Sequence, residues 1–447
     1  MASFCFLNDK TVKKFEKLDI YKKLQQVLAV PPAYTTLRVN ILNGDPRQVI
    51  ESVRKELSER HPTVEFDVRL HPVITDLLVI SSINHGPIPR EQLEKEVVVD
   101  RFCGAAVLRG ADVFASGLLV MSPNIHEGDK VSVYMDTFGK FLRGSLPPYT
   151  FPRVHIANGI SMYSRHKVFS GMASLSGVGI NITEPLYTAP KLNNFLPNLL
   201  FAQNLPSSLV AHILGPKAGE TVLDMCAAPG GKTVHLGNLM QATGTLIAID
   251  KAKKKMDVLK NNLSASGCHF AQAFCYDSAK LVCEEYGDSQ TLANGPPYPA
   301  GSFDKILLDA PCSALGQRPS FSNHITCKEL GSYPSLQRKL LSSAVSLLKE
   351  GGTLVYSTCT FTSEENELQV SWLLSHYKEM HLLPQGEFHL NKHSNVRAVY
   401  PDCTLTDQQL SLLQSFHPAF LPADKSALNY DNDTIGFFIA KFEKVSS

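Results

Sequence analysis

Residues 221–233 read TVLDMCAAPGGKT, and this stretch decides the fold class. An apolar run ends at Asp224, a turn of small residues follows, and a helical pattern begins at Lys232. Gly230 and Gly231 let the backbone approach a ligand closely at the point where a strand turns into a helix. The stretch therefore predicts a strand, a ligand-binding turn and a helix in immediate succession.

The chain downstream repeats this alternation of strands and helices. Such an alternation produces a mainly parallel sheet with helices on both faces, which binds ligands at the carboxyl ends of its strands. We therefore predict a Rossmann-like α/β domain over residues 189–447, with a long helix around Leu336 to Leu348. Its further strands are expected at TLIAID (245–250), FCYD (274–277), FDKILLDAP (303–311), TLVYSTC (353–359) and TIGFFIAKF (434–442).

Four successive predicted strands end in an aspartate: Asp224, Asp250, Asp277 and Asp309. Asp250 follows the glycines by about twenty residues, where nucleotide-binding folds place the acid that holds ribose hydroxyls. A phosphate-binding P-loop is excluded because its first glycine falls at Cys226, and the dinucleotide pattern G-x-G-x-x-G is absent from the turn. An adenosine-bearing ligand without a phosphate cradle, such as S-adenosylmethionine, fits the pattern better.

Two cysteines follow strands of the same predicted sheet, Cys312 in DAPCSALG and Cys359 in YSTCT. A structural cysteine is more often found inside the apolar run. Carbon 5 of cytosine is too weak a nucleophile to take a methyl group unaided, but a thiolate that adds to carbon 6 activates it. A base must then remove the carbon 5 proton, and the target base must leave its stack. The pair suits methylation of cytosine at carbon 5.

At these residues the sequence resembles the Sun/Fmu family of RNA (cytosine-5) methyltransferases. The paired PC and TC motifs distinguish this RNA family from DNA methyltransferases, which use the PC cysteine alone. Upstream, TEPLY and FAQNLPS are similar to the family's approach to the first strand. The motifs that carry the resemblance are DMCAAPGGKT, AID, YD, DAPCSALG, YSTCT and GFFIAKF.

The resemblance implies a role for each matched residue. Cys359 would attack carbon 6, and Cys312 would assist proton removal and product release. Asp309 would contact both the cofactor and the cytosine edge, and Lys232 would point toward the target base. The residues that would hold S-adenosylmethionine are Cys226, Ala227, Ala228, Pro229, Gly230, Gly231, Lys232, Asp250, Asp277 and Asp309.

Ala314 departs from the family, which usually has glycine after DAPCS. Alanine adopts left-handed backbone angles only at a cost. Two alternatives follow: the turn there is ordinary, or the loop after Cys312 is slightly reshaped.

Residues 97–188 have a β-rich pattern, with apolar runs AAVL, VFASGLLV, KVSVYM and VHIANGI between turn clusters. CGAAVLRGADVFASGLL, GDKVSVY and IANGI resemble a PUA domain, a small β-barrel of RNA-modifying enzymes. The family type with this insertion methylates a cytosine in the acceptor stem of certain tRNAs, near the CCA end (position 72), and its barrel reads that end. Arg109, in the VLRG turn, is the candidate RNA contact because a guanidinium donates paired hydrogen bonds; a surface arginine in a tight turn is the equal alternative. Whether messenger RNAs are further substrates stays open.

Residues 1–96 combine a lysine-rich helical stretch with a small α/β unit. Its expected elements are the strand TTLRVNIL, a helix from Pro46 to about Arg60, and the strands FDVRL and DLLVI. The unit resembles the family's N-terminal RRM-like unit. TTLRVNIL lacks the aromatic residues that stack bases, so we expect the unit to shape the RNA cleft.

The composition is that of a soluble globular protein, with 44% hydrophobic and 19% charged residues in 447. A net charge of +1 means that any RNA site is a local patch. No apolar stretch is long enough for a membrane span, and the first residues lack an export signal, so we expect a cytoplasmic protein. The ten cysteines form no C-x-x-C pair, and we expect a monomer without a metal.

Two other functions are less consistent with the sequence than an RNA methyltransferase. A non-catalytic RNA-binding protein on a methyltransferase scaffold would tolerate the loss of a cysteine or of the glycine turn, and both are intact. A methyltransferase for proteins or small molecules would have no use for the cysteine pair and the barrel.

Overall fold

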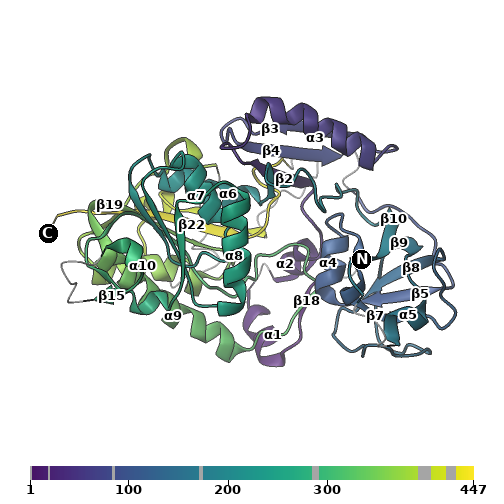
Figure 1. Ribbon diagram of the computed structural model, residues 1–447. Coiled ribbons are helices and arrows are strands. Elements are labelled where there is room, and N and C mark those ends of the chain that lie inside the picture. The colour runs from purple at the N-terminus through teal and green to yellow at the C-terminus, as the bar shows by residue number, and fades with distance from the viewer. Residues whose placement is uncertain are drawn as a thin grey trace.

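The computed structural model describes residues 3–18, 21–82, 86–170, 175–283, 291–390, 404–418 and 429–446. Three bodies, each built around a sheet, lie side by side (Figure 1). The C-terminal α/β domain is the largest, and the N-terminal sheet and the β-rich domain lie against it. The N-terminal helices fill the space between the C-terminal and β-rich domains (Figure 1).

The C-terminal domain contains an eight-stranded sheet of order β14-β13-β12-β17-β19-β22-β20, with β21 also paired to β22. Neighbours from β14 to β19 are parallel, whereas β22 runs antiparallel to β19. This is the predicted Rossmann-like sheet with a late closing strand. The strands are β12 Thr221–Asp224, β13 Thr245–Asp250, β14 Ala271–Cys275, β17 Phe303–Asp309, β19 Leu348–Thr358, β20 Met380–Leu382, β21 Gln414–Phe416 and β22 Phe437–Lys444.

Helices cover both faces of this sheet. Buried side chains of α9 and α10 pack on one face, and those of α6 and α7 pack on the other. Helix α9 begins earlier than predicted because Thr326 and Glu329 form a capping box. The helices are α6 Leu205–Leu214, α7 Gly231–Leu239, α8 Lys253–Ala265, α9 Cys327–Leu347, α10 Glu367–His376 and α12 Asp407–Ser411.

The N-terminal sheet has the order β11-β2-β4-β3 and is covered by α3 Pro46–Arg60, which has the predicted bounds. Asp45 caps this helix by accepting from the Arg47 amide, and Pro46 occupies its first turn. The first strand in the order, β11 Leu200–Ala202, comes from beyond the β-rich domain. The division at residues 188 and 189 is therefore wrong for β11, because its pairing with β2 is non-local. The other strands are β2 Tyr34–Val39, β3 Phe66–Leu70 and β4 Leu77–Ser82.

The β-rich domain is a six-stranded sheet of order β6-β10-β9-β8-β5-β7. One predicted strand is wrong: AAVL lies mostly in helix α4 Arg101–Val107. Asp100 caps this helix through the amides of Phe102 and Cys103, and a short apolar run alone does not separate strand from helix. The remaining elements are β5 Glu96–Val99, β6 Val113–Phe114, β7 Leu118–Met121, β8 Lys130–Met135, β9 Val154–Ser161, β10 Val178–Pro185 and α5 Arg165–Phe169.

The N-terminal segment packs on the C-terminal domain. Strand β1 Cys5–Phe6 pairs with β18 Ser322–Asn323, and helices α1 Asp9–Phe15 and α2 Tyr21–Leu28 follow it. Their buried aromatic and leucine side chains form a cluster with Leu315 and Phe361, while their lysines are exposed as expected.

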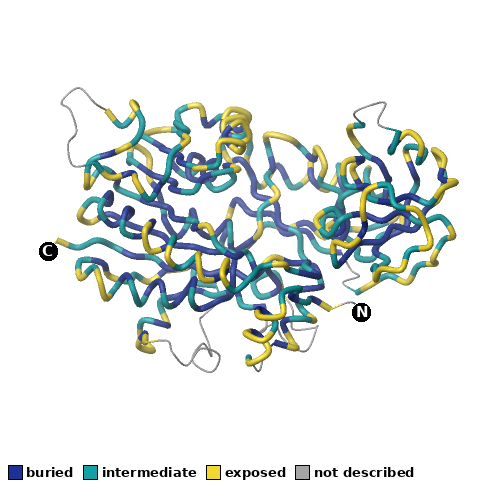
Figure 2. The backbone as a smooth tube through the Cα atoms, turned by 90° about the horizontal axis from the view of Figure 1, so that it is seen from below, coloured by how far each residue is buried: buried dark blue, intermediate teal, exposed yellow. Residues whose placement is uncertain are grey.

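Buried backbone runs through the centre of each body and exposed segments lie at the rims (Figure 2). Among the described residues, no helix has the length and apolar character needed to cross a membrane. The remaining short elements are β15 Val282–Cys283, β16 Tyr298–Pro299, η1 Ala115–Gly117, η2 Ser278–Lys280, η3 Leu292–Asn294, η4 Ser363–Glu365 and η5 Gly386–Phe388.

Candidate active site

The predicted site residues gather at the carboxyl edge of the C-terminal sheet. The strand order changes direction between β12 and β17, which is where open α/β sheets bind their ligands. Asp224 ends β12, Asp309 ends β17, and Cys312 and Cys359 follow the adjacent strands β17 and β19. Topology thus brings together residues that lie far apart in the sequence.

The turn between β12 and α7 is shaped by its glycines. Gly230 has a φ of +108°, and a Cβ there would press on Leu259, so glycine is required for two reasons. A Cβ at Gly231 would meet no protein atom within 4 Å, which leaves this backbone accessible to a ligand. Asn262 fixes the turn by donating to the Pro229 carbonyl at 2.8 Å.

The aspartates at the strand ends differ in what they bind. Asp250 accepts from the backbone amides of Ala228 and Ala252 at 3.0 and 2.8 Å, so it ties β13 to the glycine turn. Asp277, just past β14, pairs with Lys251 at 2.8 Å. Asp224, in contrast, is buried, and burial raises its pKa to about 7.

Asp224 therefore has a structural role. Its carboxylate accepts from the Thr233 hydroxyl at 2.8 Å, which fastens the start of α7 to the end of β12. The sequence pattern makes the four strand-end aspartates look alike, but only Asp224 is sealed from solvent at this edge.

Asp309 and Lys232 form an ion pair with a nitrogen–oxygen distance of 2.8 Å. Ser357 donates to the other carboxylate oxygen at 2.7 Å. Burial disfavours the charged form of Lys232, but the Asp309 carboxylate outweighs this effect and the pKa of Lys232 is raised. The Lys232 ammonium also lies 5.6 Å from the centre of the Phe437 ring. A fixed positive charge thus stands between the cofactor turn and the cysteines.

The two predicted cysteines meet: their sulfur atoms are 3.4 Å apart. Their shared hydrogen bond raises the pKa of Cys312 well above its usual value, and burial adds to this. The same hydrogen bond lowers the pKa of Cys359 against the opposing effects of burial and Asp309, and Gln317 and Lys232 assist. Of the two thiols, Cys359 therefore loses its proton more readily, and Cys312 is the one that donates in their shared hydrogen bond. This assignment makes Cys359 the stronger nucleophile.

A buried carboxylate, Glu365, holds the loop of Cys312 from beneath. Ser313 donates to it from its amide at 2.9 Å and from its hydroxyl at 2.6 Å. Thr362 donates at 2.8 Å and Gln337 at 3.2 Å, and Gln337 also reaches the Pro311 carbonyl. Four donors match the acceptor capacity of an ionised carboxylate. The sequence analysis missed Glu365, because an acid after Cys359 resembles an ordinary helix start.

The backbone at Ala314 answers the alternatives raised by the sequence. Ala314 has a φ of +55°, so the loop keeps a left-handed turn and alanine bears its cost. Just beyond, the amide of Gly316 donates to the Cys359 carbonyl at 3.0 Å. A Cβ at Gly316 would collide with the Gly436 carbonyl. The two cysteine loops are thus tied to each other and to β22.

Arg109 lies away from the sheet edge, in the exposed turn after α4. It lines a cavity of about 380 Å³ together with Tyr187 of the β-rich domain, Gln203 and Arg318. Gln317, which interacts with Cys359, lines the same cavity. The cavity therefore extends from Arg109 toward the cysteine pair.

Comparison with known proteins places this site in a family. Residues 211–443 match the family described as 16S rRNA methyltransferase RsmB/F. The chain is 42% identical over 461 residues to the tRNA (cytosine(72)-C(5))-methyltransferase NSUN6 of Mus musculus, which covers 99% of this chain and 94% of the mouse protein. Identity to the Homo sapiens protein of that name is 40%, with 99% and 96% covered.

A solved structure resembles the whole chain. The crystal structure of NSun6 from Pyrococcus horikoshii with SFG matches with a TM-score of 0.74 and 28% identity, over 97% of each chain. The agreement spans the N-terminal sheet and the β-rich domain as well as the C-terminal domain.

Proposed function

Because this chain belongs to the RsmB/F family of RNA methyltransferases, we propose that it forms 5-methylcytosine at position 72 of tRNA, next to the CCA end. The mouse and human relatives are named for that nucleotide, and the similarity covers nearly all of both proteins. The chain is an enzyme, and its cofactor is S-adenosylmethionine.

The cysteine pair is the observation that carries the proposal. Two cysteine sulfur atoms 3.4 Å apart, just past adjacent strands at the ligand edge, can provide the nucleophile and the proton carrier that methylation of carbon 5 requires. Neither a non-catalytic RNA-binding protein nor a methyltransferase for other substrates needs this pair.

The residues of the glycine turn fit the cofactor. The backbone open at Gly231 and the carboxylates of Asp250 and Asp277 lie at one strand edge, as an adenosine ligand requires. S-adenosylmethionine supplies the methyl group. We assign its binding to Cys226–Lys232 with Asp250, Asp277 and Asp309, and burial raises the pKa of Cys226, which keeps that cysteine a thiol.

The reaction uses the two cysteines in turn. The Cys359 thiolate adds to carbon 6 of cytosine, which makes carbon 5 nucleophilic toward the methyl group. Once Cys359 is bonded, it no longer shares the hydrogen bond that raises the pKa of Cys312. Cys312 then releases its own proton to solvent more readily, and the resulting thiolate accepts the carbon 5 proton; the electron pair of that C–H bond forms the carbon 5–carbon 6 double bond and expels the Cys359 thiolate. We assign contact with the cytosine edge to Asp309, whose carboxylate is held by Lys232 and Ser357.

We propose that the CCA end of the tRNA binds in the cavity lined by Arg109. It adjoins the β-rich domain, which resembles a PUA domain, and leads toward Gln317 beside Cys359. An arginine at its mouth can pair with phosphate or a base edge. The monomeric state and the cytoplasmic location stay predictions from the sequence.

Transfer of labelled methyl groups tests the proposal. We would incubate the full-length protein with labelled S-adenosylmethionine and three tRNAs: intact, lacking CCA, and with cytosine 72 changed to uridine. We expect 5-methylcytosine only in the intact tRNA. Equal labelling of the uridine-72 tRNA would refute the target nucleotide, and labelling without CCA would refute the role of the cavity. An mRNA transcript in the same assay tests the second class of RNA.

A further inference from the structure

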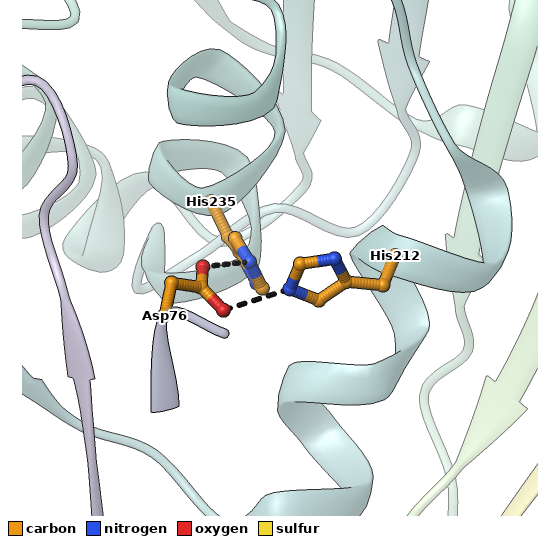
Figure 3. A group of neighbouring side chains, drawn as sticks. All are labelled: Asp76, His212 and His235. Carbon is orange, nitrogen blue, oxygen red and sulfur yellow. Dashed lines mark hydrogen bonds and ion pairs between the residues drawn. The ribbon is translucent and has the colours of Figure 1, made fainter. Parts of the chain in front are cut away.

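A buried cluster of one aspartate and two histidines joins the N-terminal sheet to two helices of the C-terminal domain (Figure 3). Asp76 immediately precedes β4, His212 lies in α6 and His235 in α7. The Nε2 atoms of His212 and His235 lie 2.8 and 2.9 Å from the two carboxylate oxygens of Asp76. Asp76 is 2% exposed and His235 is fully buried.

The three side chains are a donor set that proteins use for zinc. Two imidazoles and a carboxylate, with solvent as a fourth ligand, form common tetrahedral zinc sites. With metal–ligand bonds of about 2.0–2.1 Å, adjacent ligand atoms are about 3.3 Å apart. Because only one Asp76 oxygen would be a ligand, one nitrogen–oxygen pair would need to open by about half an ångström, and the other imidazole would need to shift toward the same oxygen. All the candidate ligand atoms lie within 4.8 Å of one another.

The protonation states suit a metal ion. Burial and the charge of Arg38 lower the pKa of His235 to about 3, so its imidazole is neutral at neutral pH. Burial alone would raise the pKa of Asp76, but its contacts with the two imidazoles hold it below the usual range. Since metal ligands must be deprotonated, binding would require the Nε2 atoms of both His212 and His235, which now donate to the Asp76 carboxylate, to be free of their protons.

The cluster is also accessible. A cavity of about 510 Å³ lies beside it, lined by Asp76, His212, Leu239 and His71 among others. The Nε2 atom of His71 lies 2.9 Å from a carboxylate oxygen of Asp431. Because His71 is held by this contact, a solvent molecule in the cavity would be the fourth ligand. The nearby Arg38 guanidinium opposes a second cation, and we expect weaker binding than at a site with four cysteines.

We propose that Asp76, His212 and His235 bind a zinc ion that fastens the N-terminal sheet to α6 and α7. Helix α7 starts at Gly231 and carries Lys232 in its first turn, so the ion would steady the helix that bears the cofactor turn. No metal is predicted from the sequence because the cysteines lack a metal-binding spacing and the two histidines lie 136 and 159 residues from Asp76.

Cobalt and zinc titrations test this site directly. The full-length protein, stripped with EDTA, is titrated with Co²⁺ and then with Zn²⁺. We expect one Co²⁺ per chain with the visible bands of a tetrahedral site and no thiolate-to-metal charge-transfer band, and displacement by Zn²⁺. A thiolate band would place the metal on cysteines and overturn the proposal, as would the lack of stoichiometric binding.

Conservative variants identify the ligands. Asp76→Asn and His212→Gln should each weaken Zn²⁺ binding by more than about 100-fold, since loss of even a supporting contact costs 10–100-fold. His166→Gln, at an exposed residue of α5, is the matched control and should bind like the wild type. Zn²⁺ should raise the melting temperature of the wild type and the control only. Folded variants that retain wild-type affinity would show that the cluster is only hydrogen-bonded.

Discussion

The loops that follow β17 and β19 present the same residue type at neighbouring strands but surround it differently. Cys312 sits above the buried carboxylate of Glu365, in a loop whose amide and hydroxyl donate to that carboxylate. Cys359 instead lies near the Lys232 ammonium and interacts with Gln317. The sulfur atoms are 3.4 Å apart, yet their pKa values move in opposite directions.

The difference shows how the surroundings within a fold can give two cysteine side chains different acidities. The shared hydrogen bond is the largest cause of both pKa shifts, and the Glu365 carboxylate near Cys312 and the Lys232 ammonium near Cys359 act in the same directions. The surrounding charges therefore reinforce a difference that the hydrogen bond between the two cysteines establishes. Substitutions in the two loops should therefore differ in their effect. The largest effect is expected at the nucleophile Cys359, and the smallest at Ala314, which affects only the loop backbone.

Cys359→Ala should have the largest effect. Without the nucleophile, carbon 5 of cytosine is not activated, and methyl transfer to tRNA should fall by more than about 10⁴-fold. Labelled 5-methylcytosine is the measurement, and Cys283→Ala in β15, which belongs to a separate two-stranded sheet with β16, is the control that should keep full activity. Substantial methyl transfer by Cys359→Ala would mean that Cys359 is not the nucleophile and that the roles of the two cysteines are interchanged.

Cys312→Ala should lower turnover by about 10²–10⁴-fold, the range for loss of a general acid–base group. Because Cys359 can still add to cytosine, a covalent protein–tRNA complex should accumulate on a denaturing gel.

The pH dependence of that complex gives a second test of Cys312. The hydrogen bond from Cys312 lowers the pKa of Cys359, so its removal should raise that pKa. The rise of complex formation with pH should then shift to higher pH than in the wild type. A complex that forms with an unchanged pH profile would contradict the shared-proton description.

Glu365→Gln should weaken the contrast between the loops without removing either thiol. The Glu365 carboxylate contributes to the raised pKa of Cys312. A neutral amide at this position would lower that pKa, so that a larger fraction of Cys312 would be thiolate. Alkylation by iodoacetamide, mapped by mass spectrometry, should show the preference for Cys359 over Cys312 reduced about tenfold, which corresponds to one pKa unit. Glu364→Gln is the matched control, since Glu364 is half-exposed and pairs with Lys14. An unchanged preference in a folded Glu365→Gln variant would remove the electrostatic explanation.

The sequence predicted what local signals determine. Helix α3 has its predicted bounds because Asp45 and Pro46 mark its start, and the strand ends at Asp250 and Asp309 follow from apolar runs of clear length. The fold class and the meeting of the two cysteines then follow from topology, because parallel strands share one carboxyl edge.

The misses depend on contacts across the chain. Strand β11 pairs with β2 although the whole β-rich domain lies between them in the sequence, and no local pattern indicates this pairing. Helix α4 was mistaken for a strand because its apolar run is short and the cap at Asp100 went unused. Glu365 and the Asp76 cluster are assembled by tertiary packing alone, so their residues look ordinary in the sequence.

Ala314→Gly should have the smallest effect, on stability more than on activity. Ala314 pays for its left-handed backbone, while glycine would relieve that cost and lose some of the gain through greater freedom of the unfolded chain. We expect stabilisation of up to about 1 kcal/mol in urea unfolding. Ala242→Gly is the matched control, because Ala242 has a φ of +54° in a turn outside both cysteine loops. If the left-handed backbone at Ala314 has no role in catalysis, Ala314→Gly and Ala242→Gly should be stabilised to the same extent. The kcat of both variants should then change less than about twofold. A loss of activity in Ala314→Gly alone would show instead that a stiff turn after Cys312 helps to hold the two sulfur atoms together.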